Sequence, residues 1–418
     1  MFKGLIGEKI YCGLDLGGQT IKASLLRVPA VAQNGDPVRP VLIGVYETKT
    51  AGFKDGAVTD LSELSESIHA TIAGLTNKTG LKLKELNVGF SGKLVQKRLG
   101  NAVVPLVDRG TKMVGNRDIV HVQHQARLLG IGMDEDVLHD FPQQYKVDDA
   151  NRTLNPRGLF ARKIELHSLL IVTNSTLIKN LNSAVNEAGF DVTRFYYSPL
   201  ASNQIVLDDY HKRQGCIILD IGTRTTEVLV FQEGQLRFMD QVNLGGEDVT
   251  VNIAKELNLS FDLAEDLKRS YAFAVSSDSN LDEEILIRRD DGYVPIKKAM
   301  IARAIETVVG KWIQALDELI KHLEFNPPIN AGVIMIGGGA LLPGLAERLE
   351  EAINLNVKIG KVPSVVKRLN HAAKYASVVG LAQMGVQQNA ARLISTLGST
   401  NKMTDLMGRI KELYQEYF

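Results

Sequence analysis

The stretch CGLDLGGQTIKASLL at residues 12–26 is repeated in outline as CIILDIGTRTTEVLVF at residues 216–231. When the copies are aligned on Asp15 and Asp220, each reads apolar run, Asp, apolar residue, Gly, two variable residues, Thr and apolar run. Each copy predicts two strands joined by a tight glycine turn. The repetition therefore predicts two similar lobes within one chain.

Such a turn can present a carboxylate, backbone N–H groups and a threonine hydroxyl to one ligand. Glycine permits the tight reversal and a close approach of the backbone, and clusters of backbone amides bind phosphate oxygens. The aspartate can hold Mg²⁺ through water while phosphates supply other ligands. One copy is weak evidence, because glycine turns with an aspartate are common. Two copies on facing lobes would clamp a phosphate chain from both sides.

A third glycine-rich turn follows in VIMIGGGALLPGL at residues 333–345. It predicts a buried strand, a turn at 337–339 and a helix. The glycines remove side chains, so a flat ring can lie against the backbone near a helix N-terminus. Taken alone, the stretch is equally well a plain strand–helix turn. The chain contains neither a Walker A loop nor G-x-G-x-x-G after its first strand.

The composition narrows the class of protein. Among 418 residues, 48 Lys and Arg balance 48 Asp and Glu, which disfavours a nucleic-acid binder. The two cysteines, Cys12 and Cys216, lie in apolar runs, so we expect a reducing compartment and no disulfide framework. Because no stretch of ~18 apolar residues occurs and no signal peptide is evident, we expect a cytosolic protein or one attached to a membrane from the cytosolic side.

Other segments predict the remaining elements. Residues 61–75 and 300–323 have the apolar spacing of helices, and residues 85–92 read as a strand ending in a turn. The stretch SPLASNQIVLDDYHKR at 198–213 is predicted as one helix. From about residue 94 to 165 the chain is charged and rich in strand and turn signals, which predicts a small inserted subdomain.

Two Asp-Gly-x-x-Thr turns followed by a triple-glycine turn resemble the actin, Hsp70 and sugar-kinase superfamily. The resemblance implies an α/β, actin-like ATPase fold with two lobes, each a mixed five-stranded sheet flanked by helices. It also implies ATP and Mg²⁺ between the lobes. A small-molecule kinase of this superfamily is the less favoured alternative, because no sugar-binding insertion or catalytic base is evident.

Within that superfamily, the stretch VLHDFPQQYKVDDANRTLNPRGLFARKIELH at residues 137–167 resembles the FtsA family pattern hxIPQxYxxD…NPxGLxGxxLxxxxH. General actin-fold proteins lack this motif. The matching positions are Pro142, Gln143, Tyr145, Asp148, Asn155, Pro156, Gly158, Leu159 and His167. The resemblance implies an inserted subdomain of the family's 1C type. The implied domains are a lobe I core (1–93 and 166–200, completed by 370–390), the 1C-type subdomain (94–165), a lobe II core (201–245 and 325–369), a subdomain 2B (246–324), a linker (391–403) and an amphipathic helix (404–418).

The resemblance also implies which residues bind the nucleotide. Asp15 and Asp220 would hold Mg²⁺ through water. The implied nucleotide-binding residues are Asp15, Gly17, Gly18, Gln19 and Thr20 (phosphate loop one), Asp220, Gly222, Thr223, Arg224, Thr225 and Thr226 (phosphate loop two), the pair Gly245 and Gly246, Glu265 and Lys268 near the adenosine, and Gly337, Gly338, Gly339 and Ala340 (the adenosine turn).

Two positions depart from the pattern. The second loop commonly reads D-[IL]-G-G-G-T, but here Thr223 and Arg224 replace two glycines. The arginine could add positive charge beside the phosphates or crowd them. Ser198 stands where active bacterial actins often carry an acidic residue that orients water. We therefore expect ATP binding with weak or no hydrolysis, and no catalytic residue is assigned.

The last residues, TDLMGRIKELYQEYF, predict an amphipathic helix at 404–418. Such a helix is too short to span a bilayer but can lie in its interface. Periodicity alone equally allows docking on the protein body, and the resemblance to the family's terminal helix favours the membrane. Two basic residues meet two glutamates, so attraction to anionic lipid should be slight. The apolar face consists of Leu406, Met407, Ile410, Leu413, Tyr414, Tyr417 and Phe418.

The resemblance implies a cell-division protein that tethers the FtsZ ring to the cytoplasmic face of the membrane at the septum and forms filaments. The implied partners are the C-terminal peptide of FtsZ, further copies of the chain, the inner-membrane lipid surface and other divisome proteins. The alternative is a PilM-like protein of type IV pilus assembly. The NPRGL stretch and the amphipathic tail disfavour it.

Overall fold

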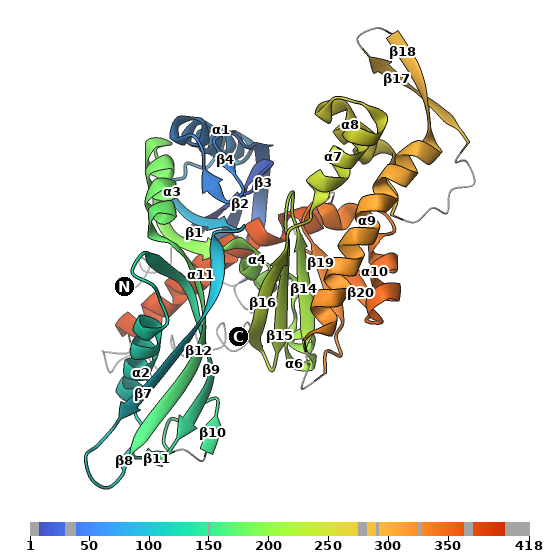
Figure 1. Cartoon of the computed structure of the whole chain (residues 1–418). Coiled ribbons are helices and arrows are strands. Elements are labelled where there is room, and N and C mark those ends of the chain that lie inside the picture. Colours follow the sequence, from blue (N-terminus) through green and yellow to red (C-terminus); the bar gives the residue numbers. More distant parts are fainter. Residues whose placement is uncertain are drawn as a thin grey trace. The chain divides into compact units, whose positions relative to one another are not determined.

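The computed structural model describes most of the 418 residues (Figure 1). The described ranges are 8–29, 39–148, 151–274, 282–289, 292–323, 328–362 and 371–397. The predicted amphipathic helix at 404–418 and part of the predicted linker lie outside them. The chain divides into two compact units: unit 1 (Met1–Ile205, Val362–Asn370 and Tyr375–Phe418) and unit 2 (Val206–Lys361 and His371–Lys374).

Unit 1 contains a mixed five-stranded sheet in the order β13-β6-β1-β2-β3. Strands β1 and β2 are antiparallel, whereas β1, β6 and β13 run parallel. The strands are β1 (Lys9–Leu16), β2 (Thr20–Val28), β3 (Val41–Lys49), β6 (Glu85–Phe90) and β13 (Asp191–Tyr197), with a small hairpin of β4 (Phe53–Lys54) and β5 (Ala57–Val58).

Helices cover both faces of this sheet. Gly44 packs against α1, while Gly13 packs against α11 on the opposite face. Helix α1 begins with Asp60 accepting from the backbone of Glu63 and ends at Gly80 in the left-handed region, so the chain itself marks both ends. The helices of unit 1's core are α1 (Leu61–Thr79), α3 (Ser175–Glu187), α4 (Ser198–Ala201) and α11 (Ala376–Leu397).

Unit 2 contains a second five-stranded sheet, in the order β16-β15-β14-β19-β20. Its central hairpin is antiparallel and β14, β19 and β20 are parallel, which repeats the topology of unit 1. The strands are β14 (Cys216–Ile221), β15 (Thr226–Gln232), β16 (Gln235–Val242), β19 (Val333–Ile336) and β20 (Val357–Ile359). The predicted pair of mixed five-stranded sheets is therefore confirmed.

Helix α9 is the largest helix packed into unit 2's core. Its apolar residues recur at helical spacing and bury Trp312 among the side chains of the sheet. The other elements of unit 2 are α6 (Asp209–Gln214), α7 (Gly246–Leu257), α8 (Phe261–Tyr271), β17 (Glu284–Arg289), β18 (Gly292–Lys297), α9 (Lys298–Lys321), η1 (Gly339–Leu341) and α10 (Leu345–Ile353). Two short elements cross the boundary between the units in sequence: α5 (Asn203–Val206) and η2 (Ala372–Tyr375).

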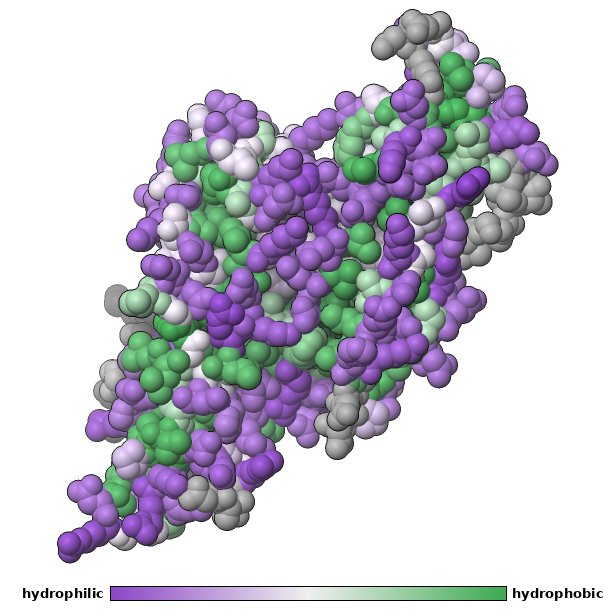
Figure 2. Space-filling view, in the orientation of Figure 1, coloured by the Kyte–Doolittle hydropathy of each residue, from purple (hydrophilic) through white to green (hydrophobic). Residues whose placement is uncertain are grey.

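The predicted inserted subdomain is a four-stranded sheet, β10-β9-β12-β7, with one helix on it. Gly100, Ala102 and Val104 of β7 face helix α2, which leaves the alternate residues Leu99 and Val103 exposed on the other face. Figure 2 shows apolar surface gathered over this subdomain. Its elements are β7 (Val95–Pro105), β8 (Lys112–Met113), α2 (Asn116–Leu129), β9 (Glu135–Val147), β10 (Asn151–Thr153), β11 (Phe160–Ala161) and β12 (Lys163–Asn174).

Two predicted segments differ from the structure. Residues 198–213, predicted as one helix, form three short ones, α4, α5 and α6. Ser202 bonds back to the carbonyl of Pro199, and Asp208 caps a new helix, so the first helix stops early. Residues 391–397, predicted as linker, continue α11, because this stretch contains neither glycine nor proline. Among the described helices, none is both long and apolar enough to cross a membrane.

Candidate functional site

Phosphate loop two joins β14 to β15 as a closed turn. Asp220 is the penultimate residue of β14, and the backbone N–H of Gly222 donates to the carbonyl of Thr225 at 2.9 Å. Thr226 starts β15, is fully buried, and donates from its hydroxyl to the carbonyl of Leu244. The indole of Trp312 donates to the same hydroxyl at 2.9 Å. The loop is thus held from its strands and from α9.

The adenosine turn lies directly against the base of this loop. A Cβ at Gly337 would come 2.4 Å from the carbonyl oxygen of Ile221 and 2.6 Å from Oδ1 of Asp220. At Gly339 it would come 2.2 Å from the side chain of Ile221. At Gly338, in contrast, no atom of the described residues lies within 4 Å. Packing within the protein therefore excludes a side chain at Gly337 and Gly339, whereas a side chain at Gly338 would meet none of the described residues. Ala340 is fully buried behind them.

The glycine pair at the start of α7 packs on the other side of the loop. A Cβ at Gly245 would come 2.5 Å from the carbonyl oxygen of Thr223. The N–H of Gly246 donates to Gly222 at 3.0 Å, and the N–H of Glu247 donates to Thr223 at 2.7 Å. The first turn of α7 is therefore fixed on phosphate loop two.

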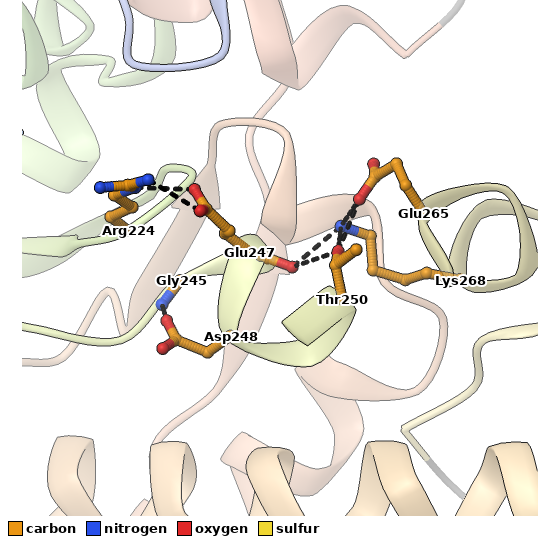
Figure 3. A network of polar contacts seen from close by, with 8 residues as sticks. Arg224, Gly245, Glu247, Asp248, Thr250, Glu265 and Lys268 are labelled. Carbon is orange, nitrogen blue, oxygen red and sulfur yellow. Dashed lines mark hydrogen bonds and ion pairs between the residues drawn. The ribbon is translucent and has the colours of Figure 1, made fainter. Parts of the chain in front are cut away.

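Glu265 and Lys268 join the same cluster (Figure 3). Lys268 Nζ lies 2.7 Å from Glu265 Oε2 and donates to the carbonyl of Gly246 and to the hydroxyl of Thr250. Burial alone would raise the pKa of Glu265, but hydrogen bonds from Lys268 and Thr250 outweigh it and lower that pKa. The predicted adenosine-side residues thus form an ion pair anchored to α7.

Arg224 projects from phosphate loop two onto α7 (Figure 3). Its Nε and Nη2 donate to the two carboxylate oxygens of Glu247 at 2.7 and 2.8 Å. The departure from the family's glycine thus places a bidentate ion pair at the loop. Sequence reasoning missed Glu247. The available signal was its place directly after the glycine pair, in the first turn of a helix.

Phosphate loop one has the matching geometry in unit 1. Asp15 lies near the end of β1, Thr20 starts β2, and the turn between them contains Gly17, Gly18 and Gln19. Thr50 braces the turn by donating to the carbonyls of Gly17 and Gln19. A Cβ at Gly17 would come 2.6 Å from the carbonyl oxygen of Thr20, whereas no described residue lies within 4 Å of one at Gly18.

The carboxylate of Asp15 has two neighbours in unit 1. Ser198 donates to its Oδ1 at 2.6 Å, and Lys22 Nζ lies 4.0 Å from Oδ2. Oxygen ligands and glycine-lined turns of this kind fit Mg²⁺ and phosphates. In unit 1 the groups of this kind are the Asp15 carboxylate and the open position at Gly18, and in unit 2 they are the Asp220 carboxylate and the open position at Gly338.

Comparisons with known families cover most of the chain. The family model described as "Cell division protein FtsA" matches residues 217–380, which include phosphate loop two and the adenosine turn. The model described as "SHS2 domain inserted in FTSA" matches residues 92–172, the inserted subdomain.

Curated relatives align along nearly the whole chain. The cell division protein FtsA of Streptococcus pneumoniae is 29% identical over 393 residues, covering 93% of this chain and 82% of the relative. That of Pseudomonas aeruginosa is 25% identical over 420 residues, covering 98% of each.

Solved structures share the fold. A PilM–PilN type IV pilus biogenesis complex matches with a TM-score of 0.63 at 18% identity, covering 90% of this chain and 98% of that one. MreB5 of Spiroplasma citri bound to ADP matches with a TM-score of 0.53 at 13% identity, covering 91% and 97%.

Proposed function

Because the chain belongs to the FtsA family of actin-like cell-division proteins, we propose that it binds Mg–ATP, self-associates and tethers the FtsZ ring to the membrane. A PilM-like role is disfavoured, because the likeness to that complex is one of fold at 18% identity. A pull-down that recovers a pilus component and no FtsZ would reverse this preference. Phosphorylation of an acetate or sugar panel would instead favour the kinase alternative.

The observation that carries the nucleotide proposal is the contrast among the three glycines of the adenosine turn. Protein atoms exclude a side chain at Gly337 and Gly339, but no described atom does so at Gly338. A ligand ring lying on this backbone accounts for the third glycine. The ADP-bound state of the fold relative MreB5 is consistent with a nucleotide on such a fold.

Substitution Gly338→Ala tests this directly. Since its Cβ meets no described atom and the backbone lies in the right-handed helical region, the variant should melt like wild type. Its affinity for Mg–ATP in calorimetry should fall by roughly tenfold through steric contact with the ligand. Unchanged affinity in a normally folded variant would contradict the assignment of the turn.

We propose that Asp15 and Asp220 hold Mg²⁺ through water and that hydrolysis is slow or absent. Ser198, a hydroxyl rather than a carboxylate, stands at the place expected to orient the attacking water, and it is already bonded to Asp15. Single-turnover assays should show ATP bound with little phosphate released. Fast multiple turnover by wild type would contradict this part of the proposal.

Self-association is supported by the open face of the inserted sheet. Leu99 is 72% and Val103 56% exposed on β7, an edge strand, away from α2. Apolar surface of this kind is typical of contact sites. Leu99→Lys should reduce sedimentable polymer in the presence of Mg–ATP. Met133→Lys, at a fully exposed apolar residue outside the sheet, is the control. Equal polymer in both variants would exclude this face.

Membrane attachment is proposed for the amphipathic segment at 404–418. Leu413→Glu, on its apolar face, should release the full-length protein from liposomes, because burial of apolar side chains must dominate binding. Gln415→Glu adds the same charge on the polar face and should leave binding intact. Continued co-sedimentation of a chain lacking 404–418 would overturn the anchor. Binding to the FtsZ C-terminal peptide and recruitment of other divisome proteins are tested separately by fluorescence anisotropy and pull-down.

A further inference from the structure

The N-terminus of α7 contacts phosphate loop two directly. Helix N-termini attract anions through their backbone N–H groups and dipole. Here the N–H groups of Gly246 and Glu247 are already bonded to phosphate loop two. The first turn also carries two carboxylates, Glu247 and Asp248. This helix end therefore places negative side chains beside a loop that is proposed to receive phosphate.

The two carboxylates are handled differently. Asp248 turns back on the helix and accepts from the N–H of Gly245 at 2.8 Å. Glu247 extends towards the loop, and its two carboxylate oxygens accept hydrogen bonds from Nε and Nη2 of Arg224. The side chains of that pair are only 33% and 22% exposed, so water screens them incompletely. An unpaired Glu247 would repel an approaching phosphate.

We propose that Arg224 is a positioning residue for phosphate binding, which holds the Glu247 carboxylate in a bidentate pair and cancels its charge beside phosphate loop two. The inference rests on the proposed nucleotide function. It explains why the chain can tolerate arginine where the family has glycine: arginine and Glu247 act as a unit. Guanidinium geometry suits this task, because its two donors match the two carboxylate oxygens.

The competing reading is that Arg224 leaves Glu247 and binds phosphate itself. A double-mutant cycle separates the two, with Mg–ATP affinity measured by calorimetry. Arg224→Gln should weaken affinity by roughly tenfold, since it exposes the Glu247 charge. Arg224→Gln combined with Glu247→Gln should restore affinity to within about threefold of wild type, because no charge remains to cancel. If the double variant stays as weak as Arg224→Gln, direct phosphate contact is correct and the proposal is overturned.

Salt dependence gives a second readout. The loss caused by Arg224→Gln should shrink between low salt and about 0.5 M salt, because repulsion between charges is screened. Arg237→Gln is the matched control: it removes a 2.7 Å arginine–glutamate pair at the opposite end of β15 and should leave affinity unchanged.

If Arg224→Gln unfolds, Arg224→Lys retains the charge and should bind within about threefold of wild type. A folded Arg224→Lys variant that binds Mg–ATP roughly tenfold more weakly than the Arg237→Gln control would overturn the proposal.

The inference and the proposed function fail in different ways. If wild type binds Mg–ATP and Gly338→Ala weakens it while folded Arg224→Gln does not, only the role of Arg224 is refuted. If wild type shows no binding of Mg–ATP, the nucleotide function itself is refuted, and the role of Arg224 with it.

Discussion

Ser198 donates a 2.6 Å hydrogen bond from its Oγ to Oδ1 of Asp15, across 183 residues of sequence. Ser198 is buried at the start of α4, and a Cβ at Gly89 would come 2.4 Å from its hydroxyl. The absence of a side chain at Gly89 therefore makes room for the serine. Three distant segments fix the orientation of one carboxylate in phosphate loop one.

Removing this hydroxyl should affect ligand binding more than folding. Ser198→Ala should reduce the free energy of unfolding by about 1 kcal/mol, the usual net value of one hydrogen bond. Its affinity for Mg–ATP should fall several-fold, because Asp15 loses the group that orients it. Ser202→Ala is the control: its hydroxyl makes an equally short bond to Pro199 in the same segment but does not touch Asp15. Equal affinities of the two variants would refute a role for the serine.

His139 ties the inserted subdomain to the core of unit 1. It lies on β9, is buried, and its Nε2 accepts from the backbone N–H of Tyr197 at 3.0 Å. Burial, with a smaller effect from the charge of Arg194, lowers the pKa of His139 to about 3. Because the unfolded chain protonates this histidine below about pH 6.5, the free energy of unfolding should fall as pH drops from there towards 3.

His139→Gln should flatten this dependence, because it offers an oxygen acceptor and does not titrate. The substitution should reduce the slope of the unfolding free energy against pH by at most about 1.4 kcal/mol per pH unit. Above pH 7 no difference in pH dependence is expected. Urea denaturation at a series of pH values measures it. Identical slopes for wild type and His139→Gln between pH 4 and 6 would contradict the assignment.

Trp312 offers an intrinsic probe of unit 2, because it is the only tryptophan in the sequence and is 1% exposed. Thr226→Val removes the hydroxyl that accepts its indole N–H, leaving a buried donor unsatisfied. The free energy of unfolding, measured by tryptophan emission, should fall by about 1–3 kcal/mol. Thr307→Val, on the exposed side of α9, should change the free energy of unfolding far less. A Thr226→Val variant as stable as Thr307→Val would show that the bond contributes nothing.

Much of the fold was predictable, because local patterns fix it. The apolar runs around Asp15 and Asp220 predicted the two hairpins, and their repetition predicted the repeated sheet topology that the structure confirms. The break within 198–213 was not predicted. It depends on a side-chain bond of Ser202 and on Gly380, where a Cβ would lie 2.0 Å from the carbonyl oxygen of Ala201.

The candidate site was predictable only in part. Glycine turns are recognisable from sequence alone, so phosphate loop two, the glycine pair and the adenosine turn were predicted. Within unit 2 these three segments contact one another. The partner of Arg224 was missed, because Glu247 is 23 residues away and its place after the glycine pair in the first turn of α7 does not indicate which residue it pairs with. Pairings between side chains depend on tertiary packing, which periodicity does not encode.

The most direct test of the account is a calorimetric titration of ATP into wild type and Asp220→Ala, each with and without Mg²⁺. Asp209→Ala, an exposed aspartate of α6, is the control. Wild type and control should bind Mg–ATP alike, Asp220→Ala at least roughly tenfold more weakly, and the difference should shrink when Mg²⁺ is withdrawn. Equal affinities of wild type and a folded Asp220→Ala variant in the presence of Mg²⁺ would contradict the central claim that phosphate loop two binds a magnesium nucleotide.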